Sequence, residues 1–581
     1  MKYNEIDKLK VDEMEVRPNL DSSVLLRSDF DWKQIERELD IQNQSELNLA
    51  YLAIDRHATS HRRDKLALLW EGKNGETERY TFGELSTLTN KFANVLSGLD
   101  VTKGDRVFFY LERIPQLYIA FFGALKLGAI VGPLFADFGP EPLKDRLKDS
   151  GAKVLITSPA LRTRIASILH ELSDIQHLII VDRTGKQTEQ GMGINYQETM
   201  EDASPDFTKI QISANDYSLM HYTSGTTGKP KGAVHIHYAA LQHYATGKWA
   251  LDLHDDDMYW CTADPGWVTG TSYGMFAPWT NGVSQVIYEG GFRASAWYSV
   301  IEKYKVTVWY TAPTAIRMLM KAGEKVTKKH DLSSLRHICS VGEPLNPEAL
   351  MWGLKAFEQP IHDNWWQTET GAILIANYPF MPVRPGSMGR PIPGIAATIL
   401  DDNYAEVQPE KEGHLAIKPG WPSMFQTYWN NHDLYQSRFK QGWYITGDRA
   451  YRDSEGYFWF VGRTDDVINT AGHLVGPFEV ESALIEHPAV SEAGVIGKPD
   501  PIAMEIIKAF VSLKDGYQPT PELRREIIQF SRSKLSSAAA PREVEFIESL
   551  PKTRSGKIMR RLLKAQELGL PLGDTSTLEE Y

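Results

Sequence analysis

Cysteine is scarce in this chain: only Cys261 and Cys339 occur among 581 residues, far apart in sequence. Two such residues exclude a disulfide framework and a thiolate zinc site, and they fit a reducing compartment. A long uninterrupted apolar run is also missing. The most apolar stretch, from residue 118 to 135, is interrupted by Lys126, Gly128, Gly132 and Pro133. It therefore predicts a buried helix followed by a strand instead of a membrane span.

The start of the sequence, Met-Lys-Tyr-Asn-Glu-Ile-Asp, has no apolar core of the kind that a secretory signal needs. Positive charge is not in excess either, because 63 Lys and Arg residues face 75 Asp and Glu residues, for a net charge of −12. This balance favours solubility and argues against a general nucleic-acid binder. We expect a cytoplasmic protein with neither nucleic acid nor membrane among its partners.

The length and composition are those of an ordinary multidomain globular protein. A chain of 581 residues is too long for one hydrophobic core, so two or more domains are expected. Apolar residues make up 42% of the chain and charged residues 24%, which fits a packed, soluble fold.

Short apolar runs alternate with helical patterns from residue 67 to about residue 182. The predicted buried strands are 106–110, 129–133, 153–157 and 177–182, and the predicted helices are 80–99 and 115–127. Strand–helix alternation indicates a largely parallel sheet with helices on its faces. The same pattern recurs at 284–288, 306–310 and 337–341.

The pattern changes in the last third of the chain. From 389 to 460, Gly and Pro become frequent and the strands are short, which predicts a small β-rich subdomain. A fresh α/β unit follows Gly462, with helices predicted at 478–487 and 521–535 and strands at 493–497 and 509–513. The predicted fold class is therefore α/β. It comprises a large N-terminal domain of parallel and mixed sheets with helices, a small β-rich subdomain, and a small α+β C-terminal domain.

The most informative stretch runs from Tyr222 to Gly232 and reads Tyr-Thr-Ser-Gly-Thr-Thr-Gly-Lys-Pro-Lys-Gly. Its glycines let backbone N–H groups approach a phosphate closely, and its hydroxyls and lysines add donors and positive charge. It differs from the P-loop, which needs Ser or Thr directly after Gly-Lys, because Pro230 follows Lys229. Apolar residues on both sides predict a phosphate-binding loop between buried strands, although an ordinary turn would explain such a string taken alone.

Four further segments accompany this loop. They are Ser340-Val-Gly-Glu-Pro-Leu-Asn346, Asp363-Asn-Trp-Trp-Gln-Thr-Glu-Thr-Gly371, Tyr444-Ile-Thr-Gly-Asp448 with Gly462-Arg-Thr-Asp-Asp466, and Pro551-Lys-Thr-Arg-Ser-Gly-Lys557. In order and rough spacing, the five segments resemble the signature set of the acyl-adenylate-forming superfamily, over about residues 50 to 565. Within it, the segment 260–270 and the pair Trp365-Trp366 are most similar to the bacterial AMP-forming acetyl-CoA synthetases, which are acetate–CoA ligases.

The resemblance implies a two-step reaction. Acetate attacks the α-phosphate of ATP to give acetyl-AMP and pyrophosphate, and the acetyl group then passes to CoA. It also implies an N-terminal adenylate-forming domain at 1–462, a hinge at 463–466 centred on Asp465, and a mobile C-terminal domain at 467–581. The implied cofactors and substrates are ATP, Mg²⁺ and CoA, with acetate or another short acid.

The transition state of adenylation spreads negative charge over phosphoryl oxygens, so fixed donors and cations supply most of the help. The resemblance assigns the β- and γ-phosphates to Thr223, Ser224, Gly225, Thr226, Thr227, Gly228 and Lys229. Lys557 matches the family's catalytic lysine, and its compact, movable ammonium suits a role that reaches both carboxylate and α-phosphate.

Other positions match the family's adenylate-binding residues. Those lining adenine and the α-phosphate are Gly342, Glu343, Pro344, Asp363, Asn364, Trp365, Trp366, Gln367 and Thr368. Asp448 resembles an aspartate that accepts hydrogen bonds from both ribose hydroxyls, and Arg463 an arginine near the ribose or phosphate. Thr368 and Glu369 join Lys557 as candidate catalytic residues, while Glu369 and Thr226 are the candidate ligands of Mg²⁺.

The resemblance also assigns an acyl pocket and a CoA path. The pocket walls are Trp267, Val268, Thr269 and Val341, with Trp366 as the floor. A ring there excludes long acids more strongly than a passive pocket, in which one methylene is worth only about 1–3 kcal/mol. For CoA, Gly472 would let pantetheine pass the backbone, while Arg532, Arg162 and Arg164 are candidates for its phosphates.

Four positions depart from the family pattern. Leu474, Ala503, Met504 and Ala538 stand where close relatives usually have Arg, Arg, Gly and His. All lie in the predicted C-terminal domain, so the thioester-forming step is the half-reaction in question. Two alternatives follow. The first is an adenylating enzyme that uses propionate or a longer acid, or that has a weakened CoA step. The second is a regulatory protein that binds ATP or adenylate without turnover.

Three further expectations complete the reading. Lys557, if it swings out to solvent, is a candidate for acetylation, which implies a lysine acetyltransferase and a deacetylase as partners. His235 and His237 form a His-x-His pair, but no zinc-spaced ligand set surrounds them, so we expect no metal there. Cys261 lies in a predicted strand and is expected in the core.

Overall fold

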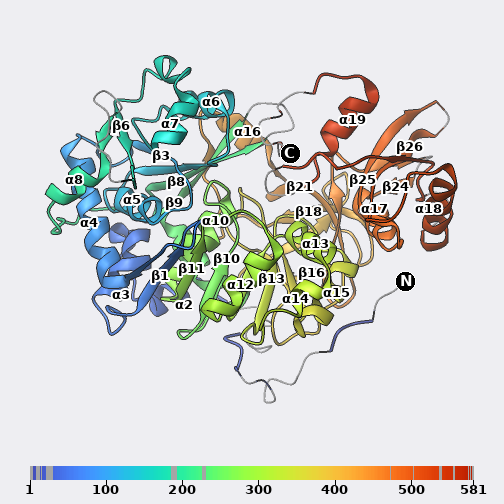
Figure 1. Ribbon diagram of the computed structural model, residues 1–581, viewed down its shortest axis with the longest axis horizontal. Helices are drawn as coiled ribbons and strands as arrows, with labels where there is room; N and C mark the ends of the chain where they lie inside the picture. Colours follow the sequence, from blue (N-terminus) through green and yellow to red (C-terminus); the bar gives the residue numbers. More distant parts are fainter. Residues whose placement is uncertain are drawn as a thin grey trace.

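The computed structural model describes residues 4–7, 14, 16–20, 30–184, 193–224, 230–470, 473–501, 503–535, 539–553, 557–572, 575 and 578. Within this part of the chain, three sheets of 14, eight and five strands form the framework, with helices packed around them (Figure 1). The predicted α/β fold class is confirmed.

The eight-stranded sheet carries the Gly-rich loop. Its order is β19 (Thr427–Tyr428), β9 (Pro230–Ile236), β8 (Tyr217–Ser224), β4 (Ile130–Leu134), β3 (Arg106–Tyr110), β5 (Val154–Thr157), β6 (His177–Ile180) and β7 (Ile194–Asn195). The strands from β8 to β7 pair in parallel, whereas β8 and β9 form an antiparallel hairpin in which Ser224 faces Pro230. The predicted strands at 106–110, 129–133, 153–157 and 177–182 all occur here.

The 14-stranded sheet changes from parallel to antiparallel partway along its length. Its order is β17 (Ala397–Leu400), β18 (Gly413–Ile417), β21 (Trp443–Arg452), β22 (Phe458–Arg463), β16 (Ser387–Pro391), β15 (Ile375–Ala376), β14 (Ile361–Trp365), β13 (His337–Ser340), β12 (Val308–Thr311), β10 (Met258–Cys261), β11 (Ser284–Tyr288), β1 (Leu66–Glu71) and β2 (Thr77–Thr81), with β20 (Phe439–Lys440) beside β21. Strands β11 to β14 pair in parallel, and every pairing from β14 to β17 is antiparallel. The change from parallel to antiparallel pairing falls at β14, the strand that ends at Trp365: β14 is parallel to β13 and antiparallel to β15.

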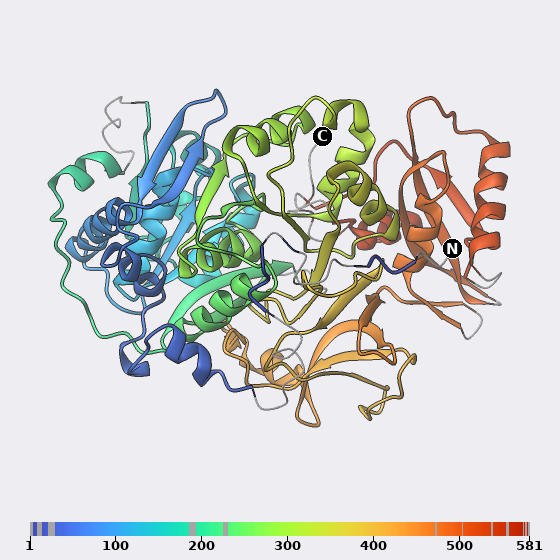
Figure 2. The ribbon, with the colours of Figure 1, turned by 90° about the horizontal axis from the view of Figure 1, so that it is seen from below.

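The five-stranded sheet is built from the C-terminal residues. It consists of β24 (His473–Val475), β23 (Ile468–Thr470), β26 (Met504–Leu513) and β25 (Val490–Asp500), with β27 (Glu543–Phe546) beside β26. Strands β25 and β26 are longer than the predicted 493–497 and 509–513, because the polar residues near the turn continue the antiparallel hairpin beyond the apolar core. This unit lies at one end of the molecule in both ribbon views (Figures 1 and 2).

Helices cover the sheets. Those of the first 322 residues are α2 (Lys33–Glu38), α3 (Arg56–Ala58), α4 (Phe82–Gly98), α5 (Pro115–Lys126), α6 (Pro140–Ser150), α7 (Pro159–Ile165), α8 (Tyr196–Asp202), α9 (Ala240–Trp249), α10 (Val268–Thr271), α11 (Ala277–Thr280), α12 (Ala294–Tyr304) and α13 (Pro313–Ala322). The remaining ones are α14 (Glu324–Thr327), α15 (Pro347–Phe357), α16 (His432–Ser437), α17 (Pro477–Ile485), α18 (Pro521–Lys534) and α19 (Arg560–Leu568). Short 3₁₀ and π turns lie at Gln44–Glu46, Tyr51–Asp55, Leu169–Glu171, His237–Ala239 and Ser272–Phe276.

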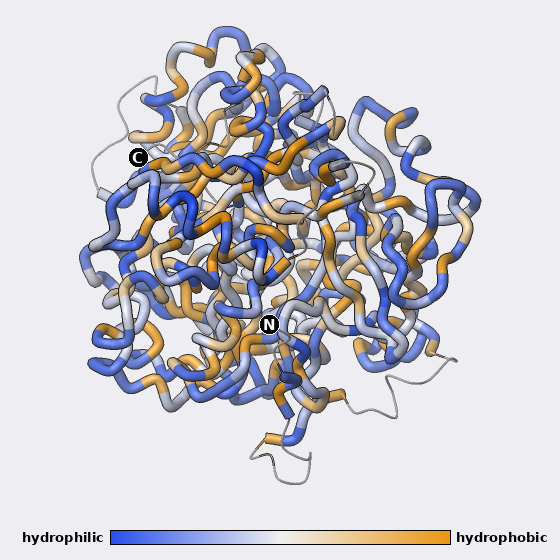
Figure 3. Tube along the Cα trace, turned by 90° about the vertical axis from the view of Figure 1, so that its right-hand side faces the viewer, coloured by the Kyte–Doolittle hydropathy of each residue, from blue (hydrophilic) through white to orange (hydrophobic). Residues whose placement is uncertain are grey.

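Local sequence explains where the helices begin. At α4, Thr81 and Glu84 form a reciprocal capping box that satisfies two otherwise unpaired backbone donors. Proline occupies the first turn of α5, where its missing N–H costs nothing, and nearly every residue of that helix is buried. The apolar segment 118–135 is therefore the predicted helix and strand, α5 and β4. Among the described residues, no helix is long and apolar enough to cross a membrane, and polar and apolar stretches alternate along the chain (Figure 3).

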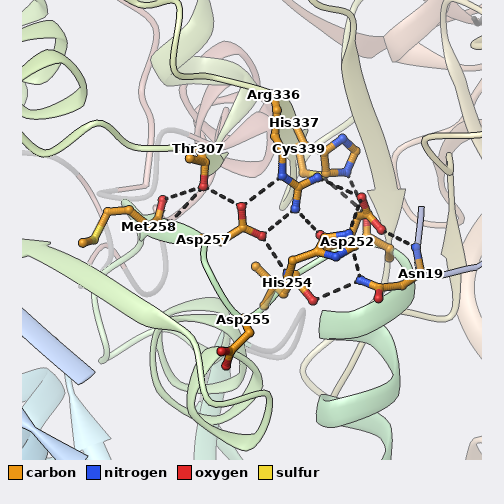
Figure 4. Close-up of polar contacts among 12 residues, drawn as sticks. Asn19, Asp252, His254, Asp255, Asp257, Met258, Thr307, Arg336, His337 and Cys339 are labelled. Atoms are coloured by element: carbon orange, nitrogen blue, oxygen red, sulfur yellow. Dashed lines mark hydrogen bonds and ion pairs between the residues drawn. The ribbon is translucent and has the colours of Figure 1, made fainter. Parts of the chain in front are cut away.

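A buried charge cluster ties the N-terminal segment to the large sheet (Figure 4). Arg336 donates to the carboxylates of Asp252 at 2.8 Å and of Asp257 at 3.0 Å, and both acids are almost fully buried. Burial acts to raise the pKa of Asp252, but hydrogen bonding to His254 and the charge of Arg336 lower it overall. The backbone N–H of Asn19 also donates to Asp252, at 2.8 Å. Breaking a buried ion cluster is costly because it leaves buried carboxylates without a partner. Asn19 is bonded to one of these carboxylates, so the cluster holds the N-terminal segment in place.

Candidate active site

The carboxylate of Asp448, on β21, is the centre of the candidate site. It accepts hydrogen bonds from the indole N–H of Trp365 at 2.9 Å, the Nε2 of Gln367 at 2.9 Å and the Nη1 of Arg463 at 2.8 Å. The carboxylate is almost fully buried, and its negative charge is the main reason that the pKa of Arg463 is raised. Strand pairing of β21 with β22 sets Asp448 directly opposite Arg463. Three predicted binding residues, two from the segment 363–371 and one from the segment 462–466, are thus brought to one acid.

Gln367 links this centre to the next turn of the chain. Its Nε2 also donates to the carbonyl of Thr446 at 3.0 Å, and its Oε1 accepts from the hydroxyl of Tyr444 at 3.2 Å. The backbone N–H of Gln367 donates to the hydroxyl of Thr370 at 2.8 Å, which fixes the turn that contains Thr368 and Glu369. The antiparallel part of the sheet therefore holds this turn rigidly.

Positive charge gathers around Glu369. Its carboxylate accepts a hydrogen bond from the hydroxyl of Tyr428 at 2.7 Å. Burial is the largest effect on the pKa values of Lys231 and Arg438, and both respond to the charge of Glu369. The pKa of Lys231 is lowered by burial and by the charges of Arg438 and Arg463, as expected where several cations lie close together. Such a group of cations suits a polyanion.

Lys557 reaches this centre from the C-terminal unit. The side chain is exposed to solvent, yet burial by the surrounding protein lowers its pKa, with a further lowering from Arg463 and opposing effects from Asp448 and Asp466. The Lys557 side chain is therefore accessible to solvent although protein atoms lie around it. Its backbone N–H donates to the hydroxyl of Thr553 at 3.0 Å. The predicted catalytic lysine therefore lies in the electrostatic neighbourhood of the predicted ribose-binding pair.

Arg560 fixes the helix that follows Lys557. It donates to Glu481 on α17 from Nε at 2.9 Å and from Nη2 at 2.5 Å, and its Nη1 lies 3.7 Å from Asp466. Glu481 is almost fully buried, which raises its pKa, although Arg560 opposes this effect. The chain downstream of Lys557 is thus tied both to the core of the C-terminal unit and to the turn at Thr464–Asp466.

The predicted segment from Gly342 to Asn346 forms the loop between β13 and α15. Gly342 has a φ of 97°, which a residue with a side chain rarely adopts. The carboxylate of Glu343 is held by Arg317 at 2.8 Å and by the backbone N–H of Thr314 at 2.9 Å. These bonds attach the loop to α13 through the side chain of Glu343.

The carboxylate of Asp363, in the middle of β14, is hydrogen-bonded within the protein. It accepts from the hydroxyl of Ser340 at 2.6 Å and from the backbone N–H of Leu345 at 3.2 Å. Burial raises its pKa to about 7 despite these hydrogen bonds. Together with Glu343, it braces the loop that carries Pro344.

The predicted acyl-pocket residues fall into two packed groups. Val341 and Trp366 belong to one buried cluster, and Val268 packs against it. Trp267 instead packs with Phe135 in a neighbouring cluster, with ring centroids 5.6 Å apart. Thr269 directly follows Val268 on α10. One wall residue, Trp267, therefore belongs to a different cluster from the floor residue Trp366, and the role of the whole set as a pocket stays a prediction.

The predicted CoA residues do not meet in this arrangement. Arg532 is exposed near the end of α18, whereas Arg162 and Arg164 are on α7, on the opposite side of the molecule (Figures 1 and 2). Arg164 donates to the carbonyl of Ala136 at 2.9 Å. Asp465 is exposed in the turn that joins the 14-stranded sheet to the five-stranded sheet, where a hinge would have to lie.

Several predictions fall outside the described residues: Gly225, Thr226, Thr227, Gly228, Lys229, Gly472 and Ala538. Thr223 and Ser224 end strand β8 immediately before that gap. Of the two residues that replace the relatives' Arg-Gly pair, Ala503 is buried, whereas Met504 is exposed with a φ of 65° at the turn between β25 and β26. That conformation is one that glycine adopts freely, which agrees with the glycine usual in relatives.

Some residues of the site carried no role in the sequence analysis. Tyr444 began a quoted motif without being assigned a function, and Lys231 lay inside the Gly-rich run. Tyr428 and Arg438 had no local signal, because only the pairing of β19 with β9 and of β20 with β21 brings their segments to Glu369. The discounted residues are in the core: burial raises the pKa of Cys261 to about 11, and His235 and His237 are both buried.

Comparison with known proteins now decides the family. Residues 54–429 match the AMP-binding enzyme family, and residues 479–557 match its C-terminal domain. The chain belongs to the AMP-binding enzyme family. An acetyl-coenzyme A synthetase of Bacillus subtilis is 54% identical over 95% of this chain and 96% of its own length. One from Methanothrix thermoacetophila is 42% identical, with 91% and 84% covered.

Solved structures of AMP-binding enzymes agree with this placement. An acyl-CoA synthetase of Brucella canis superposes with a TM-score of 0.74 at 35% identity, covering 94% of this chain and 98% of the other. An anthranilate CoA ligase in complex with anthranoyl-AMP gives a TM-score of 0.83 at 31% identity, covering 90% and 98%. The predicted resemblance to the acyl-adenylate-forming enzymes is confirmed.

Proposed function

We propose that this protein is an AMP-forming acetate–CoA ligase that uses ATP and CoA. The observation that carries the proposal is the hydrogen-bonded pair of Asp448 and Arg463, whose charges both act on Lys557 of the C-terminal unit, beside the cations around Glu369. The high identity to acetyl-coenzyme A synthetases over nearly the whole chain supports the choice of acetate. An acyl acceptor other than CoA would leave that identity unexplained.

The first half-reaction joins the carboxylate to the nucleotide. A carboxylate oxygen of acetate attacks the α-phosphorus of ATP, and the bond from that phosphorus to the pyrophosphate oxygen breaks. Negative charge builds on phosphoryl oxygens, so cations already in position stabilise the transition state without reorganising. Lys557, Lys231 and Arg438 would supply this charge, and Asp448 would hold the ribose hydroxyls while Arg463 holds Asp448.

The same site fits a magnesium ion that is bound together with the nucleotide. Among the described residues, no group of three or more His, Cys, Asp or Glu side chains is arranged to hold a metal. Mg²⁺ is commonly bound by one or two carboxylates together with substrate phosphates, so a single acid suffices. Glu369 would be that acid, with Thr226 as the predicted hydroxyl ligand; the ion would neutralise phosphate charge.

The second half-reaction forms the thioester. The CoA sulfur attacks the carbonyl carbon of acetyl-AMP, the bond from that carbon to the phosphate oxygen breaks, and the thiol proton is lost as AMP leaves. For this step the C-terminal unit would rotate about Asp465. The rotation would move Lys557, which this step does not need, out of the site and bring in the segment around Gly472. CoA phosphates would then meet Arg532, with Arg162 and Arg164 as weaker candidates.

Lys557 is also the proposed site of regulation by acetylation. Its side chain is exposed, and acetylation would remove the ammonium charge that adenylation needs. A lysine acetyltransferase and a deacetylase would be the partners, and the setting would be the cytoplasm. Mass spectrometry of the protein from cells tests this, with adenylation measured on purified acetylated protein; normal adenylation by that material would disprove the regulatory role.

A paired assay tests the main proposal. Acid-dependent ATP–pyrophosphate exchange reports adenylation, and CoA-dependent AMP release reports the full reaction, each with acetate, propionate and butyrate. We expect acetate to support both, with kcat/KM falling along the series. Exchange without CoA-dependent release would point to another acceptor, and no exchange with any acid would point to a binding protein without turnover. Lys328→Ala, at the exposed residue that follows α14, is the control for lysine substitutions.

A further inference from the structure

The indole of Trp366 is held by a buried chain of hydrogen bonds. Its N–H donates to the hydroxyl of Tyr310 at 3.2 Å, and that hydroxyl donates to the Oδ1 of Asn364 at 2.9 Å. Exposed fractions are 0% for Tyr310, 7% for Asn364 and 9% for Trp366. With water excluded, removing one member leaves a buried polar group unpaired, so the chain favours one orientation of the indole.

A second aromatic ring fixes the same indole from the side. Tyr273 meets Trp366 edge-on with ring centroids 5.2 Å apart, and meets Tyr310 edge-on at 5.4 Å. Tyr273 is itself anchored, because its hydroxyl bonds to that of Thr246 at 2.8 Å and accepts the backbone N–H of Ile373 at 2.7 Å. Edge-to-face pairs of this kind add directional preference to plain burial.

The hydroxyl of Tyr310 has a definite role in this arrangement. This hydroxyl accepts the hydrogen bond from Trp366, and the Tyr310 ring packs in the same buried cluster as the indole. Burial raises the pKa of Tyr310 well above its usual value, so the hydroxyl stays protonated and keeps donating to Asn364. Tyr310 comes from β12 and Asn364 from β14, so the bridge also ties together strands that flank β13.

A tryptophan limits substrate length only if it stays where it is. A passive pocket discriminates weakly between acids that differ by one methylene, whereas a ring fixed across the floor excludes longer chains by overlap. If the indole could rotate, the pocket would lengthen without any loss of residues. The sharpness of chain-length selection therefore depends on whatever prevents that rotation.

We propose that Tyr310 is a specificity-determining positioning residue, whose hydroxyl, bridging Asn364 and Trp366, locks the indole as the floor of the acyl pocket and so sets the upper chain length of the carboxylic acid. The inference rests on the proposed function, because that function assigns Trp366 to the pocket. Tyr310 does not touch the substrate; it acts through Trp366.

The central experiment compares wild type, Tyr310→Phe, Trp366→Gly and the double variant. For each, kcat and KM in ATP–pyrophosphate exchange are measured with acetate, propionate and butyrate. Tyr310→Phe keeps the ring and removes one hydroxyl. We expect it to raise the butyrate-to-acetate ratio of kcat/KM at least tenfold, through the KM for the acid, with the KM for ATP unchanged. In the Trp366→Gly background it should add no further change.

A matched control separates positioning from general loosening of the core. Tyr298→Phe also removes a buried hydroxyl, one that bonds to Thr327 at 3.1 Å in a different cluster. It should leave the acid ratio unchanged while lowering stability to a similar degree. An equal change of ratio in this control would overturn the proposal.

The outcomes distinguish the proposal from the function beneath it. If Trp366→Gly shifts chain-length preference and Tyr310→Phe does not, the positioning role is wrong while the pocket stands. If Trp366→Gly changes nothing, the pocket assignment itself fails. Should Tyr310→Phe not fold, Asn364→Ala removes the hydroxyl's acceptor instead, and it must shift the ratio in the same direction for the proposal to survive.

Discussion

Replacing Ser482 with alanine should weaken adenylation selectively. Ser482 is on α17, in the C-terminal unit, and its hydroxyl accepts a hydrogen bond from the Nδ2 of Asn346 at 2.8 Å. Asn346 ends the predicted nucleotide loop, is almost fully buried, and also accepts from the Nη1 of Arg317 at 3.2 Å. The bond thus crosses from the nucleotide loop to the unit that carries Lys557, in the arrangement in which Lys557 lies near Asp448.

The size of the effect follows from the type of bond. A neutral intramolecular hydrogen bond contributes about 0.5–1.5 kcal/mol net, and about 1 kcal/mol changes a two-state ratio about fivefold. If the C-terminal unit exchanges between two positions, losing the bond from one of them shifts their ratio about two- to tenfold. The ATP–pyrophosphate exchange rate of Ser482→Ala should fall within that range.

The second half-reaction is the internal reference for this prediction. Thioester formation from supplied acetyl-AMP should stay at the wild-type rate or rise, because the competing position has lost a stabilising contact. Ser533→Ala is the control, because its hydroxyl donates within α18, to the carbonyl of Phe530 at 2.7 Å. An equal fall in both half-reactions of Ser482→Ala would mean general destabilisation, and an unchanged exchange rate would mean that this bond does not bias the domain position.

Four further predictions follow from individual residues. Lys557→Ala should lower acetyl-AMP formation about 100- to 1,000-fold, the usual cost of one transition-state donor, and spare thioester formation from acetyl-AMP; equal loss in both would refute its assignment. Burial and the charge of Arg463 lower the pKa of Lys557, and adenylation needs its ammonium form. The rate of adenylation should therefore decline on the alkaline side at a pH below the ordinary pKa range of lysine. A pH–rate profile that declines only near or above that range would contradict this prediction. Leu474→Arg should raise CoA-dependent turnover about ten- to a hundredfold, the worth of a charged hydrogen bond, with pyrophosphate exchange unchanged; stopped-flow evidence that the thioester step is already fast would show the leucine to be neutral. Arg336→Leu should cost about 3–5 kcal/mol of stability by stranding Asp252 and Asp257, as read from denaturant unfolding, and a shift below 1 kcal/mol would mean that the cluster relaxes.

Much of the fold could be read from the sequence because its signals are local. Apolar runs of five residues, such as 106–110 and 284–288, became strands β3 and β11 with the same limits. Proline at the first turn and a Ser, Thr or Asn cap mark helix starts within one turn of the chain. Periodicity and turn chemistry are properties of neighbouring residues, so they need no knowledge of distant ones.

The motifs also identified the main chemical residues by themselves. Asp448, Arg463 and Lys557 were named from short segments, and the family assignment they predicted is confirmed. A motif preserves residue types at fixed spacing, and spacing within one turn or strand end is set by local geometry. Their roles in binding and catalysis stay predictions until the assays above are made.

Only the tertiary structure decided which residues that are far apart in the sequence contact one another. Trp365 donates to Asp448 across 83 positions, and Tyr310 bridges to Asn364 across 54. These meetings depend on strand order and register in the 14-stranded sheet, which no local pattern encodes. The same holds for Trp267, whose neighbour Val268 packs against the cluster that contains Trp366 while its own ring packs against Phe135. Sequence thus predicted which residues carry the chemistry, and packing over long separations determined how each one is held.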